Sequence, residues 1–143
     1  MRLIAALIAV LAATSLAACG SSSGPTPLQV GERWYRAEAR GDGSEMCKLS
    51  TPARQEAFVD LGRRLPGGSS VSSCSAAVDL ALKHYGGNAR LGKFAGVHVR
   101  LISQSANTAE VQAPKAVALK LVRSGSTWLV AGTAAPAEPK QQG

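Results

Sequence analysis

The sequence VHVRLISQSANTAEVQAPKAVALKLVRSGSTWLV, residues 97–130, contains four short runs in which apolar and polar residues alternate. A period of two puts successive side chains on opposite faces of a strand, so each run is typical of a half-buried β-strand. The apolar members are Val97, Val99 and Leu101, then Ala109, Val111 and Ala113, then Val117, Leu119 and Leu121, and finally Trp128 and Val130. Short turn-forming segments at 103–107, 114–115 and 124–126 separate the runs, which predicts a four-stranded antiparallel meander.

The part of the chain that precedes these runs has the period of helices. Val30, Trp34 and Ala37 recur at helical spacing, which predicts an amphipathic helix over residues 28–40 that ends at the sequence GDGS. A short helical turn around residues 45–49 carries Cys47.

Two further helices are expected before the strands. Thr51 suits the N-cap and Pro52 the first helical position, and the predicted buried stripe of this helix is Ala53, Ala57, Phe58, Leu61 and Leu65. Ser72 or Ser73 caps the next helix, whose predicted buried face is Cys74, Ala77, Val78, Ala81 and Tyr85. Helices followed by strands indicate an α+β fold, with the N-terminal helices packed on one face of a curved four-stranded meander.

The sequence MRLIAALIAVLAATSLAAC at residues 1–19 has the pattern of an export signal, with Arg2 before an apolar run and small residues after it. The run from Leu3 to Ala13 is shorter than the roughly 20 residues that span a bilayer. Its last residues, Leu16, Ala17, Ala18 and Cys19, resemble the bacterial lipobox at all four positions. That resemblance implies that a peptidase recognises Leu16 to Ala18 and cuts before Cys19, whose sulfur carries the lipid.

This interpretation divides the chain into four parts and gives it a location. Residues 1–18 form a lipoprotein signal peptide, 19–27 a flexible lipidated tether, 28–132 the α+β domain, and 133–143 a disordered tail. The domain is then held at the extracytoplasmic face of the cell membrane by its N-terminal lipid anchor. An ordinary signal peptide with an incidental cysteine, or a thiol that forms a disulfide, is the alternative for Cys19.

Assigning Cys19 to lipid leaves Cys47 and Cys74 as a pair. An exported compartment favours oxidation, so a structural disulfide between them is expected. A metal or redox site is the alternative, but two cysteines without a CxxC motif or a matched pair of histidines form a poor metal pattern. No metal and no cofactor are predicted.

The chain has 143 residues and a formal net charge of +7, but its basic residues are scattered. No stretch is rich in lysine and arginine, and only 4% of the residues are aromatic, so few rings are present to stack on bases. No nucleic-acid partner is therefore predicted. Anionic lipid headgroups or acidic wall polymers are a better match for the charge.

The helices, the cysteines and the closing hairpin together resemble a known superfamily. The sequences MCKLSTPARQEAF, SCSAAVDLAL and LKLVRSGSTWLV follow a helix that ends at a GDG turn, and this order is similar to the cystatin-like α+β superfamily called NTF2-like. Within it, the chain resembles small lipoproteins of high-GC Gram-positive bacteria. The resemblance implies a cone between sheet and helices, but no activity.

Candidate catalytic residues are few. Asp60 and Asp79 lie off the apolar stripes and are interpreted as solvated, and Asp42 is interpreted as a cap or turn former. His84 lies next to a helix C-terminus, where a cation is favourable, and is interpreted as structural. If the polar face of the sheet is concave, the side chains of His98, Arg100 and Glu110 could line a pocket, but a set that faces the surface is the preferred interpretation. The GxSxG, HExxH, P-loop and Rossmann motifs are absent from the sequence.

The expected function is therefore a non-catalytic binding or assembly module of the cell envelope. Its partner is an envelope protein or a small apolar ligand. The alternative is a cone-pocket enzyme or apolar-ligand carrier of the ketosteroid-isomerase-like or polyketide-cyclase-like kind, which requires a carboxylate or histidine at the bottom of a pocket. An assembly role at the membrane requires an exposed apolar patch above a few hundred Å².

Overall fold

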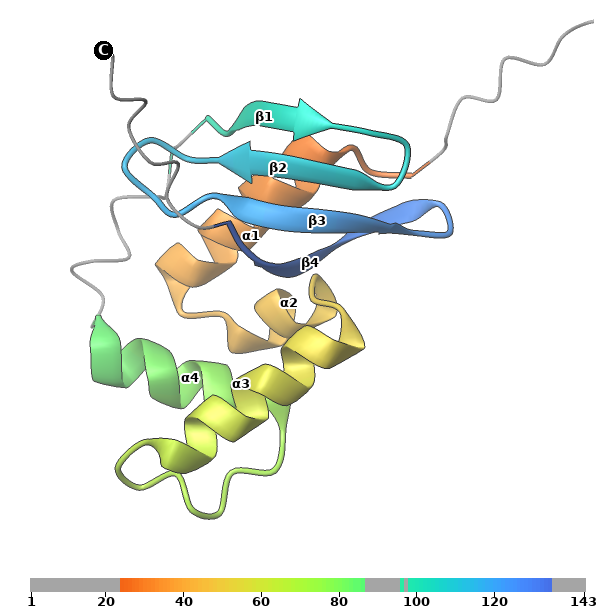
Figure 1. Cartoon of the computed structure of the whole chain (residues 1–143). Helices are drawn as coiled ribbons and strands as arrows, with labels where there is room; N and C mark the ends of the chain where they lie inside the picture. The colour runs from red at the N-terminus through yellow and green to blue at the C-terminus, as the bar shows by residue number, and fades with distance from the viewer. Residues whose placement is uncertain (1–23, 87–95, 97, 135–143) are drawn as a thin grey trace, which may run out of the picture.

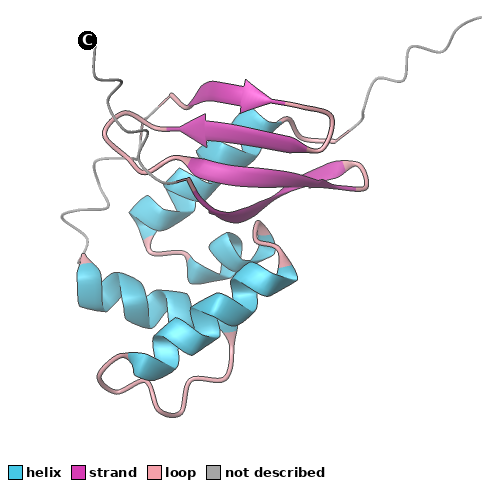
Figure 2. Ribbon diagram, viewed as in Figure 1, coloured by secondary structure: helices cyan, strands magenta, loops and turns pink. Residues whose placement is uncertain are grey.

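The computed structural model describes residues 24–86, 96 and 98–134, and it has an α+β fold (Figure 1). The elements in chain order are α1 (Pro27–Arg40), α2 (Gly43–Lys48), α3 (Pro52–Arg64), α4 (Cys74–Tyr85), β1 (Arg100–Gln104), β2 (Thr108–Gln112), β3 (Leu119–Ser124) and β4 (Thr127–Thr133). The sheet has the order β1-β2-β3-β4 with antiparallel neighbours, so the predicted meander is confirmed. α1 crosses behind the sheet, and α2, α3 and α4 form a second group next to β4 (Figure 2).

Some of the predictions fall outside the described residues. These are the signal peptide over 1–18 with Leu16, Ala17 and Ala18, the lipidated Cys19 with the first part of the tether, Val97, and the tail from residue 135. α1 begins at Pro27, within the predicted tether, and β4 extends to Thr133 with Ala134 buried behind it. Among the described helices, none has the length and apolarity needed to cross a bilayer.

α1 has clear start and stop signals. The Thr26 side chain accepts a hydrogen bond from the Gln29 amide, and the Gln29 side chain accepts one from the Thr26 amide, which forms a capping box. The helix ends at Gly41, whose φ of 69° is easily adopted only by a residue without a side chain. These signals account for the agreement with the predicted span 28–40.

The core lies between α1 and the inner face of the sheet. Its members from α1 include Val30, Trp34 and Ala37, and those from the strands include Val111, Leu121 and Val130. Gly31 lies at the contact itself, because a Cβ there would be 2.6 Å from Cγ2 of Val111. The absence of a side chain at Gly31 therefore sets how closely α1 approaches β2.

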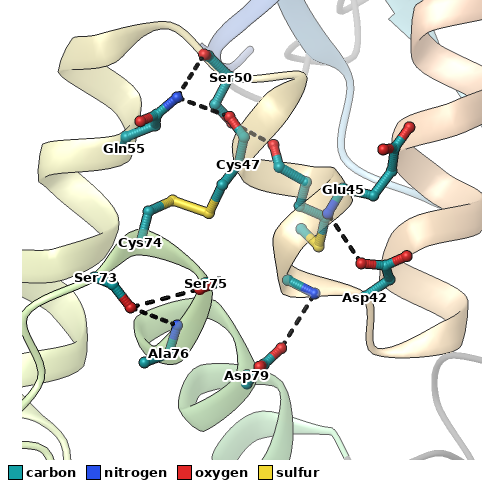
Figure 3. Close-up of a disulfide and its surroundings, with 12 residues drawn as sticks. Asp42, Glu45, Cys47, Ser50, Gln55, Ser73, Cys74, Ser75, Ala76 and Asp79 are labelled. Atoms are coloured by element: carbon teal, nitrogen blue, oxygen red, sulfur yellow. Dashed lines mark hydrogen bonds between the residues drawn. A yellow bond between two sulfur atoms is a disulfide. The ribbon is translucent and has the colours of Figure 1, made fainter.

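The predicted disulfide between Cys47 and Cys74 is confirmed, with Cα atoms 6.0 Å apart (Figure 3). It joins α2 to the first turn of α4. The prediction that Asp79 is solvated is wrong, because its Oδ1 accepts a hydrogen bond of 3.1 Å from the Gly43 amide at the start of α2. Both links fix α2 against α4.

The helical group is also hydrogen-bonded to the sheet. The Val130 amide donates to the Leu49 carbonyl at 2.7 Å, and the Thr51 amide donates to the Val130 carbonyl at 3.0 Å. The segment between α2 and α3 thus pairs with β4 as a short parallel bridge. This pairing covers part of the edge of β4.

The predicted buried stripe of α3 is displaced in the structure. Ala53, Ala57 and Leu61 are exposed, whereas Phe58 is partly buried, Gly62 and Leu65 are buried, and Gly62 lies against Ala77 of α4. The contact depends on Gly62, where a Cβ would lie 2.8 Å from the Cβ of Ala77. A pattern of apolar residues cannot detect a contact made by a glycine, which explains the error.

Two apolar residues of the strand region are also more exposed than predicted. Leu101 is 43% exposed because it lies on the edge strand β1, next to an irregularity in the pairing with β2. Val117 is 54% exposed because it precedes β3, in the connection from β2. Tyr85, predicted to be buried in α4, is 57% exposed near the end of that helix.

Candidate ligand-binding cleft

A cavity of about 870 Å³ lies where α1, α3, α4 and the β2–β3 connection meet, and we call it the cleft. Most of the side chains that line it are apolar or aromatic. They are Trp34, Tyr35, Glu38, Met46, Arg54, Phe58, Val78, Ala81, Leu82, Tyr85, Pro114, Lys115, Ala116, Val117, Leu119 and Thr133, with Gly86 beside them. The cleft thus separates the α1–sheet layer from the α3–α4 pair.

Two aromatic rings from different helices pack together at the cleft. Trp34 of α1 is almost fully buried and stacks on Phe58 of α3, with ring centroids 6.1 Å apart. On α4, Val78, Ala81, Leu82 and Tyr85 follow one another at helical spacing and form the opposite wall. Hence each wall comes from one face of an amphipathic helix.

Tyr35 fixes the loop that closes the cleft on the sheet side. Its hydroxyl donates a hydrogen bond of 2.6 Å to the Val117 carbonyl. Burial raises the pKa of Tyr35 to about 12, although a hydrogen bond with the Ala113 backbone lowers it. The phenol therefore stays protonated at physiological pH and keeps its hydrogen bond to the Val117 carbonyl.

Arg54 brings a positive charge to the cleft from the first turn of α3. Its guanidinium carbon lies 4.5 Å from the centre of the Phe58 ring, a cation–π arrangement. Its Nε is buried and has no hydrogen-bond partner among the described residues. Burial lowers the pKa of Arg54, since it disfavours the charged form.

Among the described residues that line the cleft, only Glu38 has a carboxyl group. It is partly buried, and burial raises its pKa above the ordinary value of 4.5. Its side chain makes no hydrogen bond or ion pair with another described residue. The cleft therefore contains a partly buried cation, Arg54, and a partly buried carboxyl, Glu38, and neither forms an ion pair with another described residue.

The predicted pocket of His98, Arg100 and Glu110 does not coincide with the cleft, because none of these residues lines it. His98 is exposed before β1, and Arg100 donates to Oε1 of Gln112 at 2.8 Å on the neighbouring strand. Arg100 and Glu110 alternate with buried Val99 and Val111, so they point away from the helices. The helices cover only the inner face of the sheet (Figure 1).

The other candidate residues have structural roles. Asp42 is the N-cap of α2 and accepts from the Glu45 amide, as predicted. Asp60 is exposed and pairs with Arg63, with 3.6 Å between Oδ1 and Nη1. His84 is exposed near the C-terminal end of α4 and contacts the Tyr85 ring edge-on. Within the described part of the chain, no group of three or more potential ligands could hold a metal ion.

Sequence reasoning did not single out Glu38, Arg54 or Tyr35. A signal for two of them is present in the spacing, since Glu38 follows Trp34 by four positions and Arg54 precedes Phe58 by four. A charged residue one helical turn from a buried aromatic is, however, common on amphipathic helices. The folded arrangement is needed to bring the two charges to one cavity.

Comparison of the chain with protein-family models, with curated proteins and with solved structures finds no match. The class that the observations define is therefore limited to an α+β protein with a disulfide-linked helical group and a cleft between its two layers.

Proposed function

We propose that this chain is a non-catalytic binding protein that holds a small, mainly apolar ligand in the cleft. The cleft itself supports this proposal: its volume of about 870 Å³ lies in the range of about 300–1,000 Å³ that is typical of ligand pockets. Its walls are mostly aromatic and aliphatic, with a few polar groups, which is the usual composition of such sites.

We propose further that the protein is a lipoprotein anchored at the extracytoplasmic face of the cell membrane. The export signal and the lipobox at Cys19 support this location. The disulfide agrees with it, because disulfides persist in oxidising compartments. Mass spectrometry of the mature protein tests the anchor: an unmodified N-terminus at a residue other than Cys19 would contradict it.

The NTF2-like assignment belongs to the same proposal. The order of helices followed by a four-stranded meander is consistent with it, and so is a cavity between the sheet layer and the helices. The proposed limits are a signal peptide over 1–18, a tether over 19–27, the domain from 28 and a tail near the C-terminus, with β4 extending the domain to Thr133.

A second candidate function is acid–base catalysis in the same cleft, favoured by the desolvated carboxyl of Glu38. Such chemistry also needs a donor that stabilises the developing charge of the substrate. Tyr35, the neutral donor that lines the cleft on the same helix as Glu38, already donates its proton to the Val117 carbonyl, and among the described residues no ion pair brings Arg54 or Lys115 to the Glu38 carboxyl. We therefore place binding before catalysis.

Calorimetric titration of the purified protein with dodecanol tests the binding function. A saturable heat is expected for the wild type, and Ala81→Phe should abolish it because Ala81 lines the cleft on α4. Ala76→Phe is the matched control, since Ala76 is exposed on the same helix and lies outside the cleft. Absence of binding by the wild type would overturn the proposal, and equal loss in both variants would count against the cleft as the site.

A further inference from the structure

Arg54 is the feature of the cleft that an apolar ligand alone does not explain. A guanidinium is costly to desolvate, and buried charges in proteins are usually paired. Arg54 contacts the Phe58 ring, but among the described residues it has no ion pair, and its buried Nε has no acceptor. The cation is therefore kept without a protein counter-charge beside a cavity open to ligands.

The charges around the cleft favour a ligand with one negative charge. Among the described residues, the charged side chains that line it are Arg54, Lys115 and Glu38, which carry two positive charges and at most one negative charge. Lys115 is exposed in the β2–β3 connection, whereas Arg54 is partly buried at the wall. A monoanion bound near Arg54 would leave the cleft close to neutral.

The planar guanidinium of Arg54 is also better matched to a planar carboxylate than to a spherical anion. A guanidinium presents its donors in a rigid fork that pairs with a carboxylate through two parallel hydrogen bonds. Packing on Phe58 restricts the plane of that fork, so less order is lost when an anion binds. A phosphate monoester carries about 1.5–2 negative charges at neutral pH, which exceeds what one buried arginine balances.

Resting on the proposed function, we propose that Arg54 binds the head of the ligand, and that the ligand is an amphiphile with one carboxylate and an apolar body. The apolar part lies against the aromatic and aliphatic walls of the cleft, from Trp34 and Phe58 to the face of α4.

Three probes with the same alkyl chain test this inference by calorimetry, each below its critical micelle concentration: dodecanoate, dodecanol and dodecyl phosphate. The wild type should bind dodecanoate most tightly. Arg54→Gln should weaken dodecanoate binding about 10- to 100-fold, the usual cost of losing hydrogen bonds to a charged group, and leave dodecanol binding unchanged. Arg54→Lys retains the positive charge without the forked geometry of the guanidinium. Its affinity for dodecanoate should lie between those of the wild type and Arg54→Gln.

Arg64→Gln is the matched control, because Arg64 is exposed on the same helix and lies outside the cleft. It removes the same net charge and should leave all three affinities unchanged. Equal losses in the Arg54 and Arg64 variants would overturn the role of Arg54 and indicate general charge attraction.

The outcomes separate this inference from the proposed function. If the wild type binds dodecanol and dodecanoate equally and Arg54→Gln changes neither affinity, the proposal of an anionic head group is wrong. The proposed binding of an apolar ligand in the cleft is then retained. If dodecyl phosphate binds more tightly than dodecanoate, the carboxylate is wrong. If no probe binds, the proposed function itself fails. Circular dichroism of each variant shows whether a lost affinity reflects lost folding.

Discussion

The hydroxyl of Tyr35 and the carbonyl of Val117 are joined by a hydrogen bond of 2.6 Å, which ties α1 to the connection between β2 and β3. The two residues are 82 positions apart in the chain, so this bond links the first helix to the middle of the sheet. Both residues line the cleft, and the bond therefore sets the separation of two of its walls.

Tyr35→Phe should lower the free energy of unfolding by at least about 0.5–1.5 kcal/mol, the typical net value of one hydrogen bond, because the hydroxyl donates to the Val117 carbonyl and also bonds with the Ala113 backbone. The change keeps the ring and its packing, so the loss comes from the hydroxyl alone. Urea unfolding followed by circular dichroism measures it. Unchanged stability would mean that the hydroxyl finds water equally well, and that the bond does not restrain the loop.

Gly31→Ala should destabilise the protein by about 1–3 kcal/mol, the usual cost of overpacking a core. A Cβ at Gly31 would lie 2.6 Å from Cγ2 of Val111, so α1 or β2 must move. Thermal unfolding provides the measurement. Gly132→Ala is the control, since a Cβ added at Gly132 would meet no atom within 4 Å.

A double-mutant cycle identifies the contact responsible. Val111→Ala removes the methyl groups that face Gly31, and it should be destabilising by itself because Val111 is fully buried. Combined with Gly31→Ala, the loss should be smaller than the sum of the two single losses. Strict additivity would show that the strain at Gly31 arises elsewhere.

Removal of the disulfide should cost about 3–4 kcal/mol, because the bond between Cys47 and Cys74 closes a loop with a sequence separation of 27. Cys47→Ala, Cys74→Ala and the double variant should unfold at the same urea concentration, since each removes the same covalent link. A double variant much less stable than either single one would show that the thiols contribute through packing as well.

Glu38→Gln should stabilise the protein at neutral pH. Burial raises the pKa of the folded-state carboxyl above its unfolded value, so its ionisation opposes folding as the pH rises through the folded pKa. The advantage of the variant should therefore shrink on acidification and disappear below the unfolded value near 4.5. Urea unfolding at a series of pH values measures this, and a pH-independent difference would contradict it.

Arg54→Leu should leave stability unchanged or raise it, in contrast to most substitutions of partly buried residues. The guanidinium is desolvated without an ionic partner, and an apolar side chain of similar reach avoids that cost while keeping the contact with Phe58. Thermal unfolding of Arg54→Leu beside Arg64→Leu compares the two positions. A large loss at Arg54 alone would assign the residue to the fold.

The helices and the strands could be predicted because their signals are local, whereas the disulfide was predicted because Cys47 and Cys74 remain as a pair once Cys19 is assigned to lipid. Thr51 and Pro52 mark the start of α3, the alternation from Ala109 to Ala113 marks β2, and Asp42 has the chemistry of an N-cap. Each signal lies within a few residues of the structure it specifies, and no long-range contact is needed to interpret it.

The cleft could not be predicted, because it forms only where three helices and a loop converge. The sequence pattern allowed a pocket on the polar residues of the strands, among them Arg100 and Glu110, only if that face of the sheet were concave, whereas the helices cover the other face. The prediction for Asp79 failed for a related reason, since its partner is the amide of Gly43 on another helix. Contacts with glycine and with backbone amides leave no trace in an apolar pattern.

The position of the cleft along α1 has a consequence for where the ligand site lies relative to the tether. The chain enters α1 at Pro27, whereas Trp34, Tyr35 and Glu38 line the cleft from the second half of that helix. With a rise of about 1.5 Å per residue, Glu38 lies about 16 Å along the helix axis from Pro27. If the chain is anchored at Cys19 as proposed, the tether enters the domain at one end of α1 and the cleft lies toward the other end, so the ligand site is kept away from the point where the tether enters.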